Sequence, residues 1–124
     1  MLGQWGKYPW TIDWGADKIH PHDLESFSKE TFSYKVYECT DVTDEYITIK
    51  YGEKSYRVAK DLFGAVPNPK YHIGQKVKAY RKNVLVDGII SDIMWHFDRN
   101  KHYYLITIDG RKSSNWYFED DFVE

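Results

Sequence analysis

Ile47-Thr48-Ile49-Lys50-Tyr51-Gly52-Glu53-Lys54-Ser55 is the segment from which the fold class follows. Apolar and polar residues alternate up to Tyr51, which is the two-residue period of a half-buried β-strand. Gly52 then begins a short polar turn, of the kind that joins two antiparallel strands. Strand composition returns over residues 55–59, so residues 45–59 predict a β-hairpin.

A shortened form of this segment returns in the second half of the chain. Its isoleucine-rich strand and its glycine turn both recur, and each copy is followed by an acidic and a large apolar residue. The matching residues are Ile47-Thr48-Ile49 with Ile106-Thr107-Ile108, Gly52-Glu53-Lys54-Ser55 with Gly110-Arg111-Lys112-Ser113, and Asp61-Leu62 with Asp121-Phe122. Small five-stranded barrels end with a strand, a glycine turn, a second strand and a short turn that begins at an acidic residue. Both copies follow this order, so we interpret the match as an internal repeat. The alternative is chance similarity between strands of like composition.

Proline marks the boundary between the two copies. Pro67 and Pro69 lie in the segment 66–70, and proline lacks the amide hydrogen that a central strand needs. We expect a first unit over residues 20–66, with a further strand over 33–42, and a second unit over residues 70–124. The strands expected in the second unit are 71–82, 88–97, 103–109 and 112–118, with turns at Asp87-Gly88, Asp98-Arg99-Asn100 and Asp109-Gly110.

Residues 1–19 show neither the helical nor the strand period and are expected to form an ordered N-terminal arm. Indole rings bury much apolar area, so we expect the arm to pack its tryptophans against the flank of a barrel. After the arm, Pro21 and the acidic residues that follow it predict the first turn of one short helix. The tryptophans of the arm are three of the five in the chain: Trp5, Trp10 and Trp14.

Composition excludes several classes of protein. The 124 residues are 42% hydrophobic and 18% aromatic, which is enough for a folded core and unlike a disordered chain. The 17 basic and 19 acidic residues are spread along the chain, so the net charge of −2 identifies no charged partner. No apolar run approaches the roughly 20 residues of a membrane helix. The single cysteine, Cys39, excludes an internal disulfide. We expect a cytoplasmic protein with no membrane contact and no cofactor.

Three segments of the second unit resemble SH3-like barrels of the Tudor and KOW kind, in which an apolar-Gly-x-x-Val start and an aromatic-acid-Leu end are common. They are Tyr71-His72-Ile73-Gly74-Gln75-Lys76-Val77, Gly88-Ile89-Ile90, and Asn115-Trp116-Tyr117-Phe118 with Asp120-Asp121-Phe122. The whole chain is similar to small uncharacterised bacterial proteins that begin with a Trp-Gly and Tyr-Pro-Trp arm and continue with His-Pro-x-Asp-Leu, here Trp5-Gly6, Tyr8-Pro9-Trp10 and His20-Pro21-His22-Asp23-Leu24.

The predicted fold class is therefore mostly β. We expect two tandem SH3-like small barrels with an N-terminal aromatic arm and one short helix. The sequence leaves open whether the first barrel is complete, because it shows one clear hairpin where the second unit shows four strands.

Catalytic and metal chemistry find little support in the residue pattern. The five histidines lack the spacing of a metal motif, so no metal site is predicted. A small hydrolase using His96 would also need Ser91 and an acid, Asp92 or Asp98. On one strand Ser91 and His96 would face opposite sides about 17 Å apart, so the hydrolase stays a minor alternative. Cys39 is expected to be a buried thiol, and no catalytic residue is assigned.

Aromatic residues are more numerous in the second unit than one small core can hold. The alternating pattern assigns Tyr104, Ile106 and Ile108 to the core and leaves other rings to face outward. The predicted binding residues are Trp95, Tyr103 and Trp116, with Asp98 and Glu119 as the acids that an aromatic cage for a methylated cation would need. The alternative is that these rings make the contact with the other unit or with the arm.

The sequence therefore favours a non-enzymatic protein-interaction module with a protein partner. One version is an immunity or antitoxin-like protein that caps a toxin. The alternative is a nucleic-acid-binding protein of the Tudor or KOW type. Its basic, aromatic stripe would consist of Lys76, Lys78, Tyr80, Arg81 and Lys82.

Overall fold

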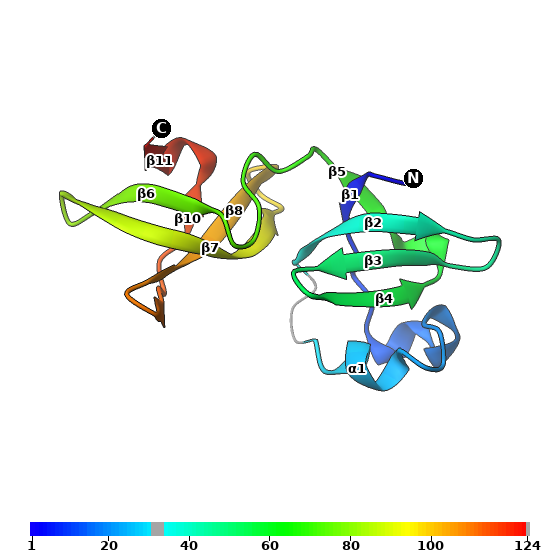
Figure 1. The fold of residues 1–124 in the computed structure, drawn as a ribbon. Helices are drawn as coiled ribbons and strands as arrows, with labels where there is room; N and C mark the ends of the chain where they lie inside the picture. Colours follow the sequence, from blue (N-terminus) through cyan, green and yellow to red (C-terminus); the bar gives the residue numbers. More distant parts are fainter. Residues whose placement is uncertain (31–33, 124) are drawn as a thin grey trace. The chain divides into compact units, whose positions relative to one another are not determined.

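The structure, a computed structural model, describes residues 1–30 and 34–123 and divides into two compact units (Figure 1). The first comprises Met1–Asn68 and the second Pro69–Glu124. Each unit is built on one antiparallel sheet, of five strands in the first and six in the second, so the predicted mostly β class is confirmed. Neither sheet closes into a barrel within the described residues, because the outermost strands of each sheet do not pair with each other.

The first sheet has the strand order β4-β3-β2-β1-β5. Its strands are β1 (Trp5–Lys7), β2 (Val36–Val42), β3 (Ile47–Tyr51), β4 (Lys54–Val58) and β5 (Gly64–Val66). The predicted hairpin is confirmed as β3 and β4, with Gly52 at a φ of 61° in the turn between them. The strand predicted over 33–42 begins at Val36, and its first predicted residue lies outside the described part of the chain.

The N-terminal arm contributes a strand to this sheet as well as packing against it. β1 lies between β2 and β5, with Gly6 opposite Tyr37 on one side and Ala65 on the other. A Cβ atom on Gly6 would lie 2.6 Å from the Gly64 carbonyl oxygen and 2.6 Å from Phe63 Cζ, so a larger residue does not fit. A strand of three residues is too short to show a two-residue period, which is why sequence patterning misses it.

Short helical segments connect β1 to β2 and lie below the sheet in the orientation of Figure 1. They are η1 (Ile12–Trp14), η2 (Ala16–Lys18) and α1 (Leu24–Ser28). α1 is the predicted helix, but it begins at Leu24, so Pro21 precedes it and does not lie in its first turn. The ring of Phe27 anchors these segments, because its centroid lies 4.9 Å from that of Tyr56 and 5.6 Å from that of Trp10. Trp10 is buried as expected, whereas Trp14 is 56% exposed. None of the described helices is long and apolar enough to cross a membrane.

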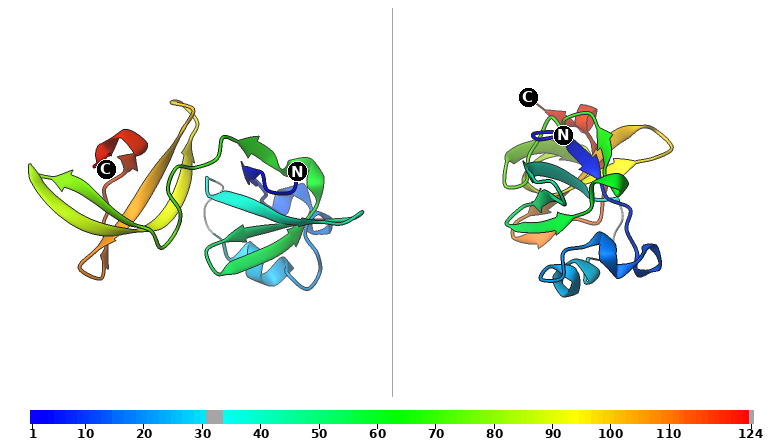
Figure 2. Two further views of the ribbon diagram at one scale, coloured as in Figure 1. Left: turned by 45° about the horizontal axis from the view of Figure 1, so that its top comes forward. Right: turned by 90° about the vertical axis from the view of Figure 1, so that its right-hand side faces the viewer.

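The second sheet has the strand order β10-β8-β7-β6-β11, with β9 paired to β8. Its strands are β6 (Lys76–Arg81), β7 (Val84–His96), β8 (Lys101–Ile108), β9 (Arg111–Lys112), β10 (Tyr117–Phe118) and β11 (Phe122–Val123). The long strand β7 pairs with β6 through its first half and with β8 through its second (Figure 2). The one-turn helix η4 (Glu119–Asp121) leads into β11, and η3 (Lys60–Leu62) has the same place before β5.

The two sheets share their connectivity when the strands of each unit are counted in chain order. In both, the first strand lies between the second and the last, and the third lies beside the second. In both, the turn after the third strand contains a glycine in the left-handed region, Gly52 or Gly110. The second strand of each sheet also carries a bulge, between Cys39 and Asp41 in β2 and between Ile90 and Asp92 in β7. The residues of the sequence match therefore occupy corresponding places in the two sheets.

Several predicted bounds in the second unit are wrong. Asp87-Gly88 lies within β7, and the chain turns instead at Lys82-Asn83, whose φ angles are 51° and 65°. Asparagine is common in this left-handed conformation, but lysine is not. The pair Lys82-Asn83 therefore does not predict a turn from sequence. The strand predicted over 112–118 is interrupted between β9 and β10, and the one predicted over 71–82 begins only at Lys76.

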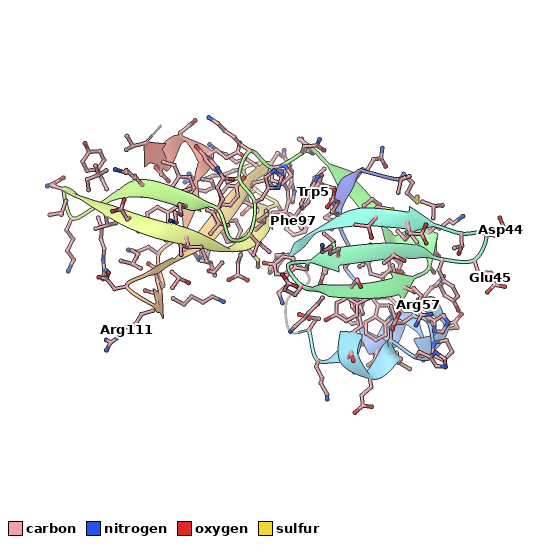
Figure 3. The ribbon with its side chains drawn as sticks, in the orientation of Figure 1. Trp5, Asp44, Glu45, Arg57, Phe97 and Arg111 are labelled. Atoms are coloured by element: carbon pink, nitrogen blue, oxygen red, sulfur yellow. The ribbon has the colours of Figure 1, made fainter. Side chains whose placement is uncertain are left out.

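An ion pair between Arg57 and Asp23 joins the helical segments to the first sheet; Arg57 is labelled in Figure 3. Arg57 Nε donates to Asp23 Oδ2 at 2.8 Å, Arg57 Nη2 donates to Oδ1 at 3.2 Å, and the Arg57 amide donates to Oδ2 at 2.8 Å. Arg57 lies on β4, and Asp23 immediately precedes α1. The side-chain hydrogen bonds from Arg57 are the main cause of a lowered pKa at the Asp23 carboxyl.

Asp23→Asn should lower the free energy of unfolding at neutral pH by about 1–2 kcal/mol, since the pair is partly exposed. The pKa of Asp23 is lower in the folded state than in the unfolded chain, where it is about 4. The stabilisation is therefore present above about pH 4 and is lost as the pH falls through the folded-state pKa. Urea unfolding of both proteins across this range checks the prediction. A difference in unfolding free energy that stays constant down to low pH would contradict it.

Candidate interaction surface on the second unit

The pairing of β7, β8 and β10 determines which side chains share a face of the second sheet. Residues directly opposite each other on neighbouring strands project to the same face. Tyr103 lies opposite Phe118 of β10, and Lys101, two residues before Tyr103, lies opposite His96 of β7. Tyr104 is fully buried and faces the core, as predicted. Tyr103 and its neighbours therefore belong to the other face, which we call the outer face.

Four rings form a cluster on the outer face, called the aromatic cluster below: His96, Tyr103, Trp116 and Phe118. The rings of Trp116 and Tyr103 have centroids 4.9 Å apart and planes inclined by 31°. The His96 ring lies 6.0 Å from that of Trp116 and 5.8 Å from that of Phe118. Trp116 is 59% exposed and Tyr103 only 8%. The cluster thus presents one large exposed indole supported by a buried ring.

Two cations border the aromatic cluster. The Arg99 guanidinium carbon lies 5.1 Å from the centroid of the Phe118 ring, and Lys101 Nζ lies 5.0 Å from it. Both side chains are exposed, and neither makes an ion pair with an acid in residues 1–30 or 34–123. Cations of the protein itself thus occupy the favourable position over this ring, where they would repel a methylated cation. The two cations therefore suit a carboxylate better than a methylated cation.

The structure brings together two of the five residues predicted for the site, Tyr103 and Trp116. Trp95 projects to the opposite face and is 7% exposed, because successive residues of a strand alternate between faces. Asp98 is exposed in the turn between β7 and β8. Glu119 lies in η4, where its carboxylate bonds within the fold.

Sequence reasoning missed four members of this surface: His96 and Phe118 of the cluster, and the cations Arg99 and Lys101. Phe118 could have been found, since it lies two residues after Trp116 and shares its side of an extended chain. His96, Arg99 and Lys101 depend on the register between β7 and β8, which the bulge between Ile90 and Asp92 shifts. A register of this kind leaves no local signal in the sequence.

His96 packs against other rings and, within the described part of the chain, lacks the contacts that a hydrolase would require. Its Nδ1 accepts a hydrogen bond from the Arg99 amide at 3.2 Å. The Ser91 hydroxyl lies 3.1 Å from the Leu105 carbonyl oxygen and 3.2 Å from Asp92 Oδ2. No hydrogen bond among the described residues joins Ser91 to His96. Nowhere in residues 1–30 and 34–123 do three His, Cys, Asp or Glu side chains lie close enough to hold a metal ion.

Glu119 holds the start of the second unit against its sheet. Its Oε2 accepts a hydrogen bond from the Tyr104 hydroxyl at 2.6 Å and another from the Lys70 amide at 2.8 Å. Burial, followed by the hydrogen bond to Glu119, raises the pKa of the Tyr104 hydroxyl well above its usual range. Tyr104 therefore remains a neutral donor at any physiological pH, and Glu119 has a structural role.

Glu119→Ala should lower the free energy of unfolding by about 2 kcal/mol or more, because it leaves the buried Tyr104 hydroxyl without an acceptor. Glu119→Gln keeps an acceptor oxygen and should lose less. Asp120→Ala is the matched control, since Asp120 is an exposed acid in the same turn and should change stability by less than about 0.5 kcal/mol. Chemical denaturation compares the three. Equal effects of Glu119→Ala and Asp120→Ala would show that the Tyr104 bond is not formed.

Comparison with known proteins gives a family without an assigned activity. No curated protein and no solved structure matches the chain. A family model matches residues 1–123, which is nearly the whole sequence and includes both sheets. The aromatic cluster and the arm therefore lie within one matched region, and the chain belongs to the family of unknown function DUF6960.

Proposed function

We propose that the protein is a non-enzymatic protein-interaction module that binds its partner through the aromatic cluster. The observation that carries the proposal is Trp116, an exposed indole whose ring lies 4.9 Å from the buried ring of Tyr103. Trp and Tyr supply large contact areas with few rotatable bonds, and with Arg they dominate binding hot spots. Because Tyr103 already supports the Trp116 ring, ordering it on binding would cost little side-chain entropy.

Charge defines the partner further. Arg99 and Lys101 lie beside the cluster and are free of ion pairs among the described residues, so they can pair with carboxylates of a partner. The surface fits a protein segment that presents a large apolar side chain next to acidic residues. Complementary charge of this kind speeds association and discriminates against wrong partners.

The thiol gives no support to catalysis. Cys39 is fully buried, and burial raises the pKa of its thiol, which opposes the thiolate form that a nucleophile needs. A protein with one buried thiol is compatible with a reducing cytoplasm. The proposal therefore places the protein in the cytoplasm. The similarity of the whole chain to small bacterial proteins supports a bacterial cytoplasm.

We also propose that the two units are both SH3-like and are related by an internal repeat. The shared strand order, the bulge in each second strand and the 3-10 turn before each last strand support it. An immunity or antitoxin-like protein that caps a toxin is one version of such a two-unit binding protein.

Nucleic-acid binding is the second candidate. β6 places Lys76, Lys78 and Tyr80 on one face, because they are two residues apart, and Tyr80 is 61% exposed. Arg81 and Lys82 follow at the end of the strand. An exposed ring among cations is the arrangement that holds single-stranded nucleic acid.

Trp116→Ala should weaken binding to the partner at least about 30-fold, the equivalent of the ~2 kcal/mol that a hot-spot residue contributes. The experiment captures proteins from a lysate of the native cell on immobilised protein and identifies a stoichiometric partner. Titration calorimetry on the purified pair then gives the affinity of each variant. Trp14→Ala is the matched control, because Trp14 is 56% exposed but lies in the first unit, and it should bind like the wild type.

Charge reversal supplies the second arm. Arg99→Glu combined with Lys101→Glu should weaken binding and reduce its dependence on salt. The proposal is overturned if no stoichiometric protein is captured, or if the captured partner binds Trp116→Ala as tightly as the wild type. Retention on single-stranded RNA or DNA that falls steeply with salt, without a protein partner, would establish the second candidate instead.

A further inference from the structure

The second unit carries a hollow of about 720 Å³, called the basic hollow below. Its lining comes from three places: the tip of the β6–β7 hairpin at Arg81-Lys82, the β8–β9 hairpin, and the segment 113–115 that follows. The β8–β9 hairpin contributes Ile108, Asp109, Arg111 and Lys112. Both hairpins end in two-residue turns, Lys82-Asn83 and Asp109-Gly110, in which every residue has a positive φ. Turns of this length fix the positions of the flanking residues. Figure 3 labels Arg111, which extends outward from the β8–β9 tip.

Cations outnumber acids in this lining. The cationic side chains are Arg81, Lys82, Arg111 and Lys112, and the acid is Asp109. Lys112 Nζ lies 2.7 Å from Asp92 Oδ2, whereas the other three cations make no ion pair within residues 1–30 and 34–123. A chain with a formal net charge of −2 thus gathers a net positive charge in one hollow.

The remaining lining residues indicate the chemistry of the ligand. Ser113, Ser114 and Asn115 add neutral hydrogen-bond donors, and Ile108 is the one apolar side chain among the described lining residues. No aromatic ring occurs among these residues, so the hollow offers a nucleobase nothing on which to stack. The donors and charges together match a compact anion with many acceptor oxygens.

Lys82 occupies a backbone conformation that lysine seldom adopts. Its φ of 51° lies in the left-handed region, where asparagine and glycine are favoured in two-residue hairpin turns. The turn therefore loses some stability by having lysine there, and gains a cation at the edge of the hollow. This observation is independent of the count of charges.

We propose that the basic hollow binds a polyphosphate group, such as that of a nucleoside triphosphate or a short inorganic polyphosphate. Arginine binds phosphate oxygens in a bidentate manner, lysine acts as a point charge, and hydroxyl and amide groups donate to the remaining oxygens. A polyphosphate concentrates several charges within one hollow, whereas a nucleic-acid strand spreads one charge per nucleotide along its length and requires rings for its bases. The inference concerns residues other than the aromatic cluster and does not rest on the proposed protein partner.

The first unit has a hollow whose lining carries the opposite charge. This hollow, of about 420 Å³, is lined by three acids, Asp41, Asp44 and Glu45, of which Asp44 and Glu45 are labelled in Figure 3. Arg57 also lines it, but its charge is paired with Asp23. A polyanion is repelled there. Binding should therefore be confined to the second unit.

Titration calorimetry of the full chain with inorganic tripolyphosphate tests the proposal. The wild type should bind one tripolyphosphate with an affinity that falls as salt rises. Arg81→Ala combined with Arg111→Ala should bind about a hundredfold more weakly, since each of the two lost charged hydrogen bonds is worth about a factor of ten. Lys29→Ala combined with Lys50→Ala is the control, because it removes two exposed cations from the first unit and should bind like the wild type.

Lys82→Asn separates the binding role from a structural one. Asparagine suits the left-handed position, so the variant should unfold at a higher temperature than the wild type and yet bind tripolyphosphate more weakly. A variant that gains stability without losing affinity would exclude Lys82 from the site and contradict the proposal. The proposal is also overturned if tripolyphosphate does not bind at low salt, if the first-unit control loses as much affinity, or if only a single-stranded oligonucleotide binds. These assays contain no protein partner, so their outcome is independent of the capture experiment.

Discussion

The pairing of the last strand of each unit with its first strand is the constraint on which the rest of the structure depends. β1 lies between β2 and β5, and β6 lies between β7 and β11, so a strand from the start of each unit becomes central in its sheet. In the first unit Gly6, opposite Ala65, permits this pairing, because a Cβ atom there would collide with Gly64 and Phe63. In the second unit the fully buried Ala79 lies opposite Phe122. The first strand of a unit acquires its second neighbour only when the last strand of that unit has been synthesised. The pairings therefore tie both ends of each unit into its core.

The units differ in what covers their sheets. In the first, the segments between β1 and β2 form α1 and two 3-10 turns, whose Phe27, together with Tyr8 and Trp10, completes one core cluster. In the second, the described residues form no α-helix, and the strands are joined by short turns. The outer face of the second sheet is thus left without a helix of its own unit. This difference explains why an exposed indole, Trp116, and two exposed cations occur together on that face.

Sequence patterning predicted the features that depend on local chemistry. The alternation around Ile47 and Ile49 and the turn at Gly52 predicted a hairpin that the structure confirms, and Pro21 followed by acids predicted a short helix. The pattern also assigned Tyr104 and Ile106 correctly to the core. These predictions are correct because each depends on the residues of a single strand or turn.

The features that sequence missed depend on partners distant in the chain. β1 is three residues long and exists only because β2 and β5 flank it. Trp95 was expected in the cluster and faces the other way, because the face of each β7 residue is set by its pairing with β8 beyond a bulge. Glu119 was expected as a cage acid, but its carboxylate is held by Tyr104. Register and long-range hydrogen bonds decide these placements, and neither is encoded in a local pattern.

The pairing of the last strand of each sheet with its first can be measured directly by NMR. Cross-strand nuclear Overhauser effects are expected between the backbone protons of Gly6 and Ala65 in the first unit, and between those of Ala79 and Phe122 in the second. Slow amide exchange of β1 and β6 should accompany them, since these strands are central in their sheets. Absence of both effects, with β5 or β11 paired to a different strand, would contradict the account.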